Sequence, residues 1–175
     1  MSPVDLRALV REIPDFPQKG ILFKDITPLL LDRSALEAAV GDLAAFARPL
    51  DVQFVIAAEA RGFILGGALA RELGAGFVPA RKRGKLPSDT VSIEYLLEYG
   101  VDVLEVHADA FADGARVLVH DDLLATGGTA RGVCDLVAGL GAEVVGCAFL
   151  IELSFLGGRE RLAPYPVHAA LEYAS

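Results

Sequence analysis

The chain has 175 residues, of which 53% are hydrophobic, and a formal net charge of −8. This length and composition are sufficient for a full core, so we expect one domain spanning residues 1–175. The acidic balance argues against a nucleic-acid partner, which would require a basic face, and no apolar run is long enough to cross a bilayer. With charged residues already present near the start, we expect neither a membrane span nor a signal peptide.

The periodicity of apolar residues, together with caps and breakers, predicts strands alternating with helices. Ser2 and Pro3 are typical of a helix start, and Asp32 and Ser34 can cap a second helix. The expected order is a helix over residues 2–12, a proline-rich loop over 13–20, a loop or short strand over 21–31, a helix to about 48, a strand over 52–57, a helix over 62–73, strands over 77–80, 91–94, 101–107 and 116–120, a helix over 129–140 and a strand over 143–151.

Such alternation indicates an α/β fold with a mostly parallel sheet covered by helices on both faces. Residues 81–107, which include a basic cluster, are interpreted as an excursion from that core. We expect His120, at the end of an otherwise apolar strand, to be partly exposed. Cys134 and Cys147 fit no zinc-ligand spacing and are interpreted as buried packing residues. Because nothing in the chain needs a disulfide, we expect a cytoplasmic protein.

The most informative segment is an apolar strand followed by Asp121 and Asp122 and then by a Thr-Gly-Gly-Thr turn that opens a helix. Glycines let the backbone approach an anion closely, and the helix start adds unsatisfied N–H groups. The turn therefore has the properties of a phosphate cradle. Two carboxylates beside it would repel the phosphate unless they accept hydrogen bonds from sugar hydroxyls, which a ribose 5-phosphate would supply.

Two other interpretations of this segment remain open on the residues alone. The aspartates could hold a metal ion for phosphoryl chemistry, or the segment could be a structural turn. The chain contains neither the G-x-G-x-x-G fingerprint of dinucleotide sites nor the G-x-x-x-x-G-K-[ST] loop.

A second informative segment, residues 81–85, carries four cations in five residues of an acidic chain. Such a local cluster indicates a small anionic ligand, although a solvated loop is the alternative.

These segments resemble the type I phosphoribosyltransferases, and most closely the adenine phosphoribosyltransferases. The match to the 5-phosphoribosyl-1-pyrophosphate (PRPP) signature, Asp-Asp-Leu-Leu-Ala-Thr-Gly-Gly-Thr, is long and specific. Matched blocks in the same order lie at residues 13–28, 59–63, 81–87 and 97–100. The resemblance implies the type I fold with an N-terminal hood over about residues 1–31 and a mobile loop, and it implies transfer of a phosphoribosyl group from PRPP to adenine.

The resemblance also implies a role for particular residues. The ribose hydroxyls would contact Asp121 and Asp122, and the 5′-phosphate would contact Ala125, Thr126, Gly127, Gly128 and Thr129. Adenine would be held by Leu22, Phe23, Lys24 and Leu123. Pyrophosphate would be bound by Glu59, Ala60, Arg61, Arg81, Lys82 and Lys85, with a cis peptide expected between Glu59 and Ala60.

For catalysis the resemblance implies Glu98, which would handle the proton on N7 of the base, and Arg61. Tyr99 would help the loop to close. Magnesium is the expected cofactor, bound through substrate oxygens and water rather than by protein ligands, and a homodimer is the expected assembly. The chain departs from many members of the family at Glu59-Ala60 and at Lys24, where Asp-Ser and arginine are usual.

Three rival functions would each give a different result in a biochemical assay. A transferase for another purine would accept an oxopurine base, since an adenine site leaves groups unpaired with one. A non-catalytic regulator of the same fold would bind PRPP without base-dependent release of pyrophosphate. A metal-dependent phosphatase would release phosphate from phosphomonoesters.

Overall fold

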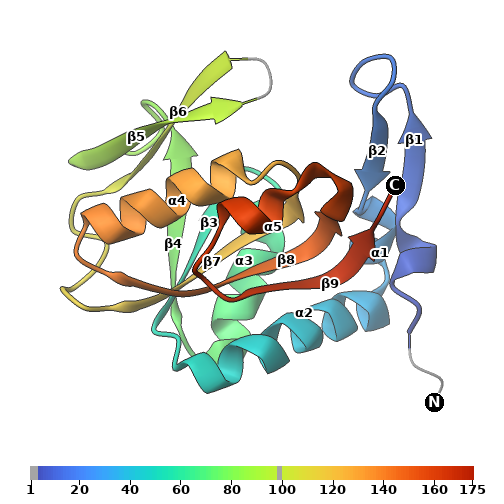
Figure 1. Ribbon diagram of the computed structural model, residues 1–175. Helices are drawn as coiled ribbons and strands as arrows, with labels where there is room; N and C mark the ends of the chain where they lie inside the picture. The colour runs from blue at the N-terminus through green and yellow to red at the C-terminus, as the bar shows by residue number, and fades with distance from the viewer. Residues whose placement is uncertain (1–3, 98–99) are drawn as a thin grey trace. The chain divides into compact units, whose positions relative to one another are not determined.

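Figure 1 shows the computed structural model, which describes residues 4–97 and 100–175. The chain divides into two compact units, Met1–Asp42 and Leu43–Ser175. The expectation of a single domain with a hood over residues 1–31 stays a prediction. Throughout the described ranges, no helix combines the length and apolar character that crossing a membrane requires.

The first unit contains a two-stranded antiparallel sheet, in which Ile13 of β1 pairs with Phe23 of β2. The helix predicted over residues 2–12 is wrong in its described part, where the chain forms only one short 3-10 turn and then a strand. Pairing between β1 and β2 explains the difference. Ion pairs join Arg11 to Asp25 and Glu12 to Lys24, which are the directly opposite residues of the two strands. The elements of this unit are η1 (Arg7–Leu9), β1 (Arg11–Pro14), β2 (Leu22–Asp25) and α1 (Thr27–Leu31).

Between residues 32 and 153, the predicted order of helices and strands is confirmed, and most bounds agree within a few residues. The elements that follow Leu153 were not predicted. The helical elements are α2 (Arg33–Ala47), which crosses from the first unit into the second, η2 (Arg48–Leu50), α3 (Gly62–Leu73), α4 (Gly128–Gly139), η3 (Ser154–Leu156) and α5 (Gly158–Arg161). The strands are β3 (Phe54–Ala58), β4 (Gly76–Lys82), β5 (Thr90–Leu97), β6 (Gly100–His107), β7 (Arg116–Leu124), β8 (Glu143–Leu153) and β9 (Val167–Tyr173).

These seven strands form one sheet in the order β5-β6-β4-β3-β7-β8-β9 (Figure 1). Strands β4, β3, β7, β8 and β9 are mutually parallel, whereas β6 is antiparallel to both of its neighbours, β4 and β5. The mostly parallel α/β sheet is therefore confirmed. The carboxyl ends of β3, β4 and β7 meet at one edge of the sheet, where ligands of such folds bind.

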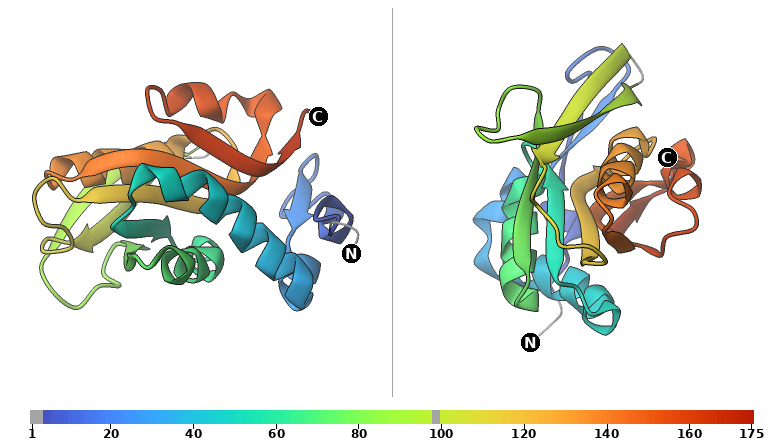
Figure 2. Two further views of the ribbon diagram at one scale, coloured as in Figure 1. Left: turned by 90° about the horizontal axis from the view of Figure 1, so that it is seen from below. Right: turned by 90° about the vertical axis from the view of Figure 1, so that its left-hand side faces the viewer.

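Helices cover both faces of the central strands (Figure 2). Successive residues of a strand point to opposite faces, so alternate residues pack against one helical layer or the other. On one face, Val55 and Leu118 pack with Leu69 of α3 and with the last turns of α2. On the other face, Ile56 and Val119 pack with α4. The two layers make the sheet a rigid platform for the loops at its carboxyl edge.

Two expectations about the sheet are corrected. The segment over residues 81–107 is not an excursion, because Arg81 and Lys82 are the last residues of β4 and pair with β6. His120 is 1% exposed rather than partly exposed, because β7 continues for four more residues and is covered on both faces. Its Nδ1 lies 2.9 Å from the carbonyl oxygen of Ala148. Cys134 and Cys147 are buried and free, as expected.

Candidate active site

The predicted phosphate cradle, named here the phosphate loop (residues 125–129), joins the end of β7 to the start of α4. Gly127 has φ of 80°, a left-handed conformation that favours glycine. A Cβ on Gly127 would lie 2.7 Å from the carbonyl oxygen of Gly158, and one on Gly128 would lie 2.5 Å from that of Leu96. Both glycines are therefore required by close backbone approach, and the first turn of α4 opens onto the loop.

A pocket of about 270 Å³ lies over this loop. Its lining combines the whole phosphate loop with the end of β7 and the end of β5. The lining residues are Leu97, Asp121, Leu123, Leu124, Ala125, Thr126, Gly127, Gly128, Thr129 and Ala130. The structure thus brings the predicted phosphate-binding residues together with one predicted ribose-binding residue and with Leu123.

The two aspartates have different surroundings, as neighbouring residues of a strand do. Asp122 is 5% exposed, and its Oδ2 lies 3.0 Å from Nε of Arg61, at the start of α3. Asp121 lines the pocket, and burial together with the adjacent Asp122 raises the pKa of Asp121 well above its usual range, although Arg61 lowers it. A Cβ on Gly62 would lie 2.8 Å from Oδ1 of Asp121, so the loop after β3 packs directly against this carboxylate.

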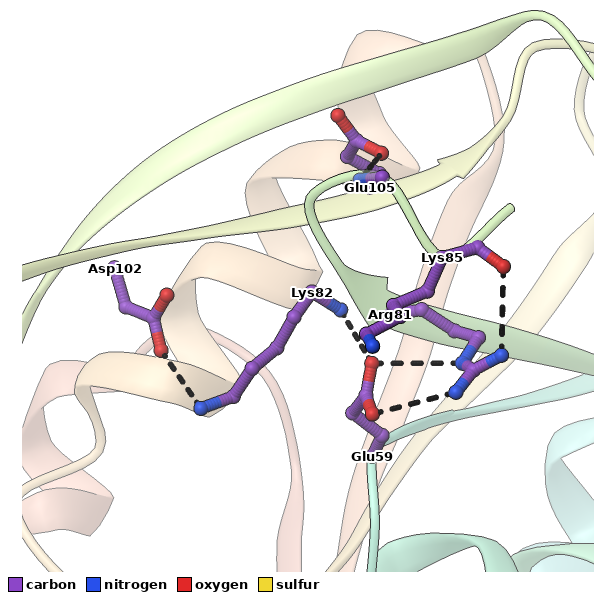
Figure 3. A network of polar contacts seen from close by, with 7 residues as sticks. Glu59, Arg81, Lys82, Lys85, Asp102 and Glu105 are labelled. Carbon is purple, nitrogen blue, oxygen red and sulfur yellow. Dashed lines mark hydrogen bonds and ion pairs between the residues drawn. The ribbon is translucent and has the colours of Figure 1, made fainter. Parts of the chain in front are cut away.

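That loop contains the expected cis peptide between Glu59 and Ala60. The carboxylate of Glu59 accepts a hydrogen bond of 2.6 Å from the backbone N–H of Lys82, and its Oε1 lies 3.4 Å from Nε of Arg81. Burial raises the pKa of Glu59, but these contacts outweigh burial, and the net shift is downward. The ionised Glu59, next to the cis peptide, thereby holds the first two residues of the basic segment (residues 81–85) (Figure 3).

The rest of the basic segment turns back toward β6. Arg81 donates to the carbonyl oxygen of Lys85 at 3.4 Å, and the backbone N–H of Gly84 donates to Oε2 of Glu105 at 3.0 Å. The ammonium group of Lys82 extends instead to Asp102, with 3.3 Å between Nζ and Oδ2. Figure 3 shows Lys82 pointing away from Glu59 toward β6.

Three of the predicted adenine-binding residues belong to the first unit. Leu22 is 44% exposed, and the ring of Phe23 contacts that of Phe16 edge-on, with 5.0 Å between centroids. Lys24 is 6% exposed and forms an ion pair with Glu12. Leu123, the fourth, belongs to the second unit and lines the pocket. Glu98 and Tyr99 lie outside the described residues, so their predicted roles stay predictions.

Sequence reasoning missed four residues that contact the predicted site residues or the segments that contain them. Tyr95 and Asp102 are hydrogen-bonded to each other, and Glu105 holds the turn of the basic segment. Arg161 of α5 has a guanidinium nitrogen 3.4 Å from the position that a Cβ on Gly128 would take. Each is brought to the site by strand pairing or by packing between segments far apart in the chain, which local pattern cannot reveal.

The side chains at this edge of the sheet offer few donor atoms to a metal ion. The described ranges hold no group of three or more His, Cys, Asp or Glu residues suited to bind a metal ion. Asp121 is a single hard oxygen donor on the pocket wall, and Asp122 already contacts Arg61. This donor set fits a magnesium ion that keeps substrate oxygens and water as most of its ligands.

Residues 30–165 match the family model of the phosphoribosyl transferase domain. Fold and site thus define a phosphoribosyltransferase of type I. The chain is 56% identical to the adenine phosphoribosyltransferase of Rubrobacter xylanophilus, over 96% of this chain and 91% of that protein. Relatives of this similarity over nearly the whole length show that the chain belongs to the adenine phosphoribosyltransferase family.

Solved structures agree with this assignment. The adenine phosphoribosyltransferase of Thermoanaerobacter pseudethanolicus superposes with a TM-score of 0.94 at 49% identity, over 96% of this chain and 98% of that one. The enzyme of Saccharomyces cerevisiae, solved with adenine and D-2,5-dideoxy-2,5-imino-altritol 1,6-bisphosphate, superposes with a TM-score of 0.89 at 35% identity, over 94% of this chain and 95% of that one. The family and the fold expected from the sequence are both confirmed.

Proposed function

We propose that this protein transfers the 5-phosphoribosyl group of PRPP to N9 of adenine, giving AMP and pyrophosphate. The observation that carries the proposal is the pocket over the phosphate loop, which joins a helix start to the carboxylate of Asp121 in a chain of this family. A neutral set of backbone N–H groups and hydroxyls can bind the 5′-phosphate without reacting with it.

Binding of PRPP is assigned to two groups of residues. The phosphate loop takes the 5′-phosphate, and Asp121 and Asp122 accept hydrogen bonds from the ribose hydroxyls. Support for this division comes from the pocket lining and from the contact between Asp122 and Arg61. The pyrophosphate group is assigned to the backbone of Glu59 and Ala60 and to the side chains of Arg61, Arg81, Lys82 and Lys85.

In the chemical step, N9 of adenine forms a bond to C1 of the ribose as the bond from C1 to the pyrophosphate oxygen breaks. Negative charge grows on the leaving oxygens, so fixed cations there stabilise the transition state more than the ground state. Arg61, at the start of α3, is one of these cations, and its ion pair with Asp122 orients it. Glu98 is assigned to the proton on the base, a contribution of about 10² to 10⁴ in rate.

Adenine is assigned to Phe23 and Leu123, which would stack on the ring, and to the backbone of Leu22 and Lys24, which would read its polar edge. Base stacking contributes about 1 to 3 kcal/mol. Use of the backbone alone explains why lysine serves at position 24, where arginine is usual in the family. Tyr99 is assigned to closure of the site.

The proposal includes magnesium, a homodimer and a cytoplasmic location. Magnesium carried by PRPP would neutralise charge on the pyrophosphate group, and the donor set around Asp121 is compatible with it. Two free thiols in the core are in keeping with a reducing compartment. The dimer rests on the family resemblance, and sedimentation of the purified protein tests it.

A product assay tests the proposed function. The protein is incubated with PRPP and magnesium and with adenine, hypoxanthine, guanine or xanthine, and nucleotide and pyrophosphate are measured. AMP formed from adenine, with little product from the oxopurines, is the expected result. Product from an oxopurine alone, or PRPP binding with no release of pyrophosphate by any base, would overturn it.

A further inference from the structure

No sequence pattern indicated a role for Asp102 of β6, yet it contacts Lys82, one of the cations assigned to pyrophosphate. Its Oδ2 lies 3.3 Å from Nζ of Lys82 and accepts a hydrogen bond of 3.3 Å from the hydroxyl of Tyr95. Its Oδ1 accepts the backbone N–H of Val103 at 2.8 Å. Both oxygens are therefore occupied, and the carboxylate has one fixed orientation.

Strand register explains why these three side chains meet. Asp102 lies directly opposite Tyr95 in the pairing of β5 with β6, and Lys82 lies opposite Leu104 in the pairing of β4 with β6. Opposite residues share a face of an antiparallel pair, as do residues two apart in a strand. Lys82, Asp102 and Tyr95 thus project from the same face, and Tyr95 is 9% exposed there against α4.

Lys82 is held at two points, its backbone and the end of its side chain. The backbone N–H of Lys82 donates to Glu59, beside the cis peptide, and the ammonium group is held by Asp102. The Lys82 side chain is 58% exposed, so without Asp102 its long stem would sample many rotamers. An ammonium group has three N–H donors, so two remain for an anion while one is held by the carboxylate.

Tyr95 connects this arrangement to the phosphate loop. Its hydroxyl interacts with the side chain of Thr129 as well as with Asp102, and Gly132 of α4 packs against its Cβ. Burial and the neighbouring Asp102 raise the pKa of Tyr95 to about 12, so it stays a hydrogen-bond donor at neutral pH. Asp102 is therefore anchored to the same helix start that is assigned to the 5′-phosphate.

We propose that Asp102, anchored by Tyr95, is a positioning residue that aims the ammonium group of Lys82 at the pyrophosphate group of PRPP. This inference rests on the proposed function and adds a residue to it. Asp102 itself contacts no substrate. Its contribution is to order Lys82 before the anion arrives, which lowers the entropic cost of binding.

A purely competitive role for Asp102 predicts the opposite change in pyrophosphate binding. If Asp102 only competed with pyrophosphate for Lys82, its neutralisation would strengthen binding of the anion. Glu94 provides a matched control, because it is exposed on the same hairpin and lies opposite Val103, so it projects from the other face. Glu94→Gln removes the same charge as Asp102→Asn without touching Lys82.

The experiment is calorimetric titration of the full-length protein with pyrophosphate and magnesium, and separately with ribose 5-phosphate. Asp102→Asn is expected to weaken pyrophosphate about fivefold while ribose 5-phosphate changes less than about twofold, and Glu94→Gln is expected to change neither beyond about twofold. Tyr95→Phe should weaken pyrophosphate in the same direction. Lys82→Met should weaken it, and the Lys82→Met, Asp102→Asn double variant should equal Lys82→Met alone.

Unchanged or tighter pyrophosphate binding by Asp102→Asn would overturn the inference, as would full additivity in the double variant. A melting temperature within a few degrees of wild type for each variant shows that the fold is retained. Failure of the proposed function is distinguishable, because it appears in the wild type as absence of AMP formation from adenine and PRPP. Wild-type activity together with normal pyrophosphate binding by Asp102→Asn would contradict only the positioning role of Asp102.

Discussion

The guanidinium group of Arg61 and the buried carboxylate of Asp122 form an ion pair, with 3.0 Å between Nε and Oδ2. The pair joins the first turn of α3 to the end of β7, so the loop assigned to pyrophosphate and the carboxylates assigned to ribose are fixed against each other. A guanidinium group carries five N–H donors in a fixed plane, so the contact of Nε with Asp122 sets the direction of the whole group. Asp122 therefore orients Arg61.

Arg61→Gln should lower kcat/KM for PRPP by roughly 10- to 100-fold, because it removes a cation beside the leaving group and leaves Asp122 without its partner. Steady-state kinetics with PRPP varied at saturating adenine measure the effect. Arg71→Gln, in the last turn of the same helix, is the matched control and should leave kcat/KM unchanged. Equal kinetics for the two variants would exclude Arg61 from the site.

Gly128→Ala should abolish detectable binding of ribose 5-phosphate, because the added methyl group would lie 2.5 Å from the carbonyl oxygen of Leu96 and displace the phosphate loop. Gly139→Ala, at the other end of α4, meets nothing within 4 Å and should be neutral or stabilising by up to about 1 kcal/mol. Titration and thermal unfolding distinguish the two. Normal ligand binding by Gly128→Ala would show that the loop tolerates a side chain at this position.

His120 should make the protein acid-sensitive. Burial lowers its pKa from 6.5 to about 4, so the unfolded chain binds more protons than the folded one between these values. Stability is therefore retained above pH 6.5 and falls as pH drops toward 4, by about 3 kcal/mol in total. Denaturant unfolding of wild type and His120→Val across this range measures the difference. Parallel pH profiles for the two proteins would contradict this origin.

Glu98→Gln should lower kcat by more than about tenfold while the affinity for PRPP changes little, because the amide cannot accept the proton of the base. Pre-steady-state measurement of AMP formation separates the chemical step from product release. Glu94→Gln, an exposed glutamate on β5, should retain wild-type rates. An unchanged chemical step in Glu98→Gln would remove this residue from the mechanism.

Much of this fold follows from local sequence signals. The helix α3 begins and ends where Gly62 and Gly74 predict, and the Thr-Gly-Gly-Thr turn does open α4. Pairing between distant strands accounts for the errors: β1 replaces the helix expected from Ser2 and Pro3, and β9 was not expected at all. Short edge strands carry weak periodicity, and their stability comes from partners that the local pattern does not specify.

The site divides in the same way. The phosphate loop and the two aspartates are contiguous in the chain, so a sequence pattern identified them. Asp102 and Tyr95 acquire their contacts only through the register of β5, β6 and β4, and the pairing of Asp122 with Arg61 spans 61 positions along the chain. Such contacts depend on tertiary structure, and they determine how the charged groups are aimed.

A crystal structure of the protein with AMP tests the central claim most directly. We expect the phosphate of AMP within hydrogen-bonding distance of the backbone N–H groups of residues 126–129, and the ribose hydroxyls at Asp121 and Asp122. A phosphate bound elsewhere on the molecule, or crystals that remain free of AMP at saturating concentration, would contradict the assignment of this pocket.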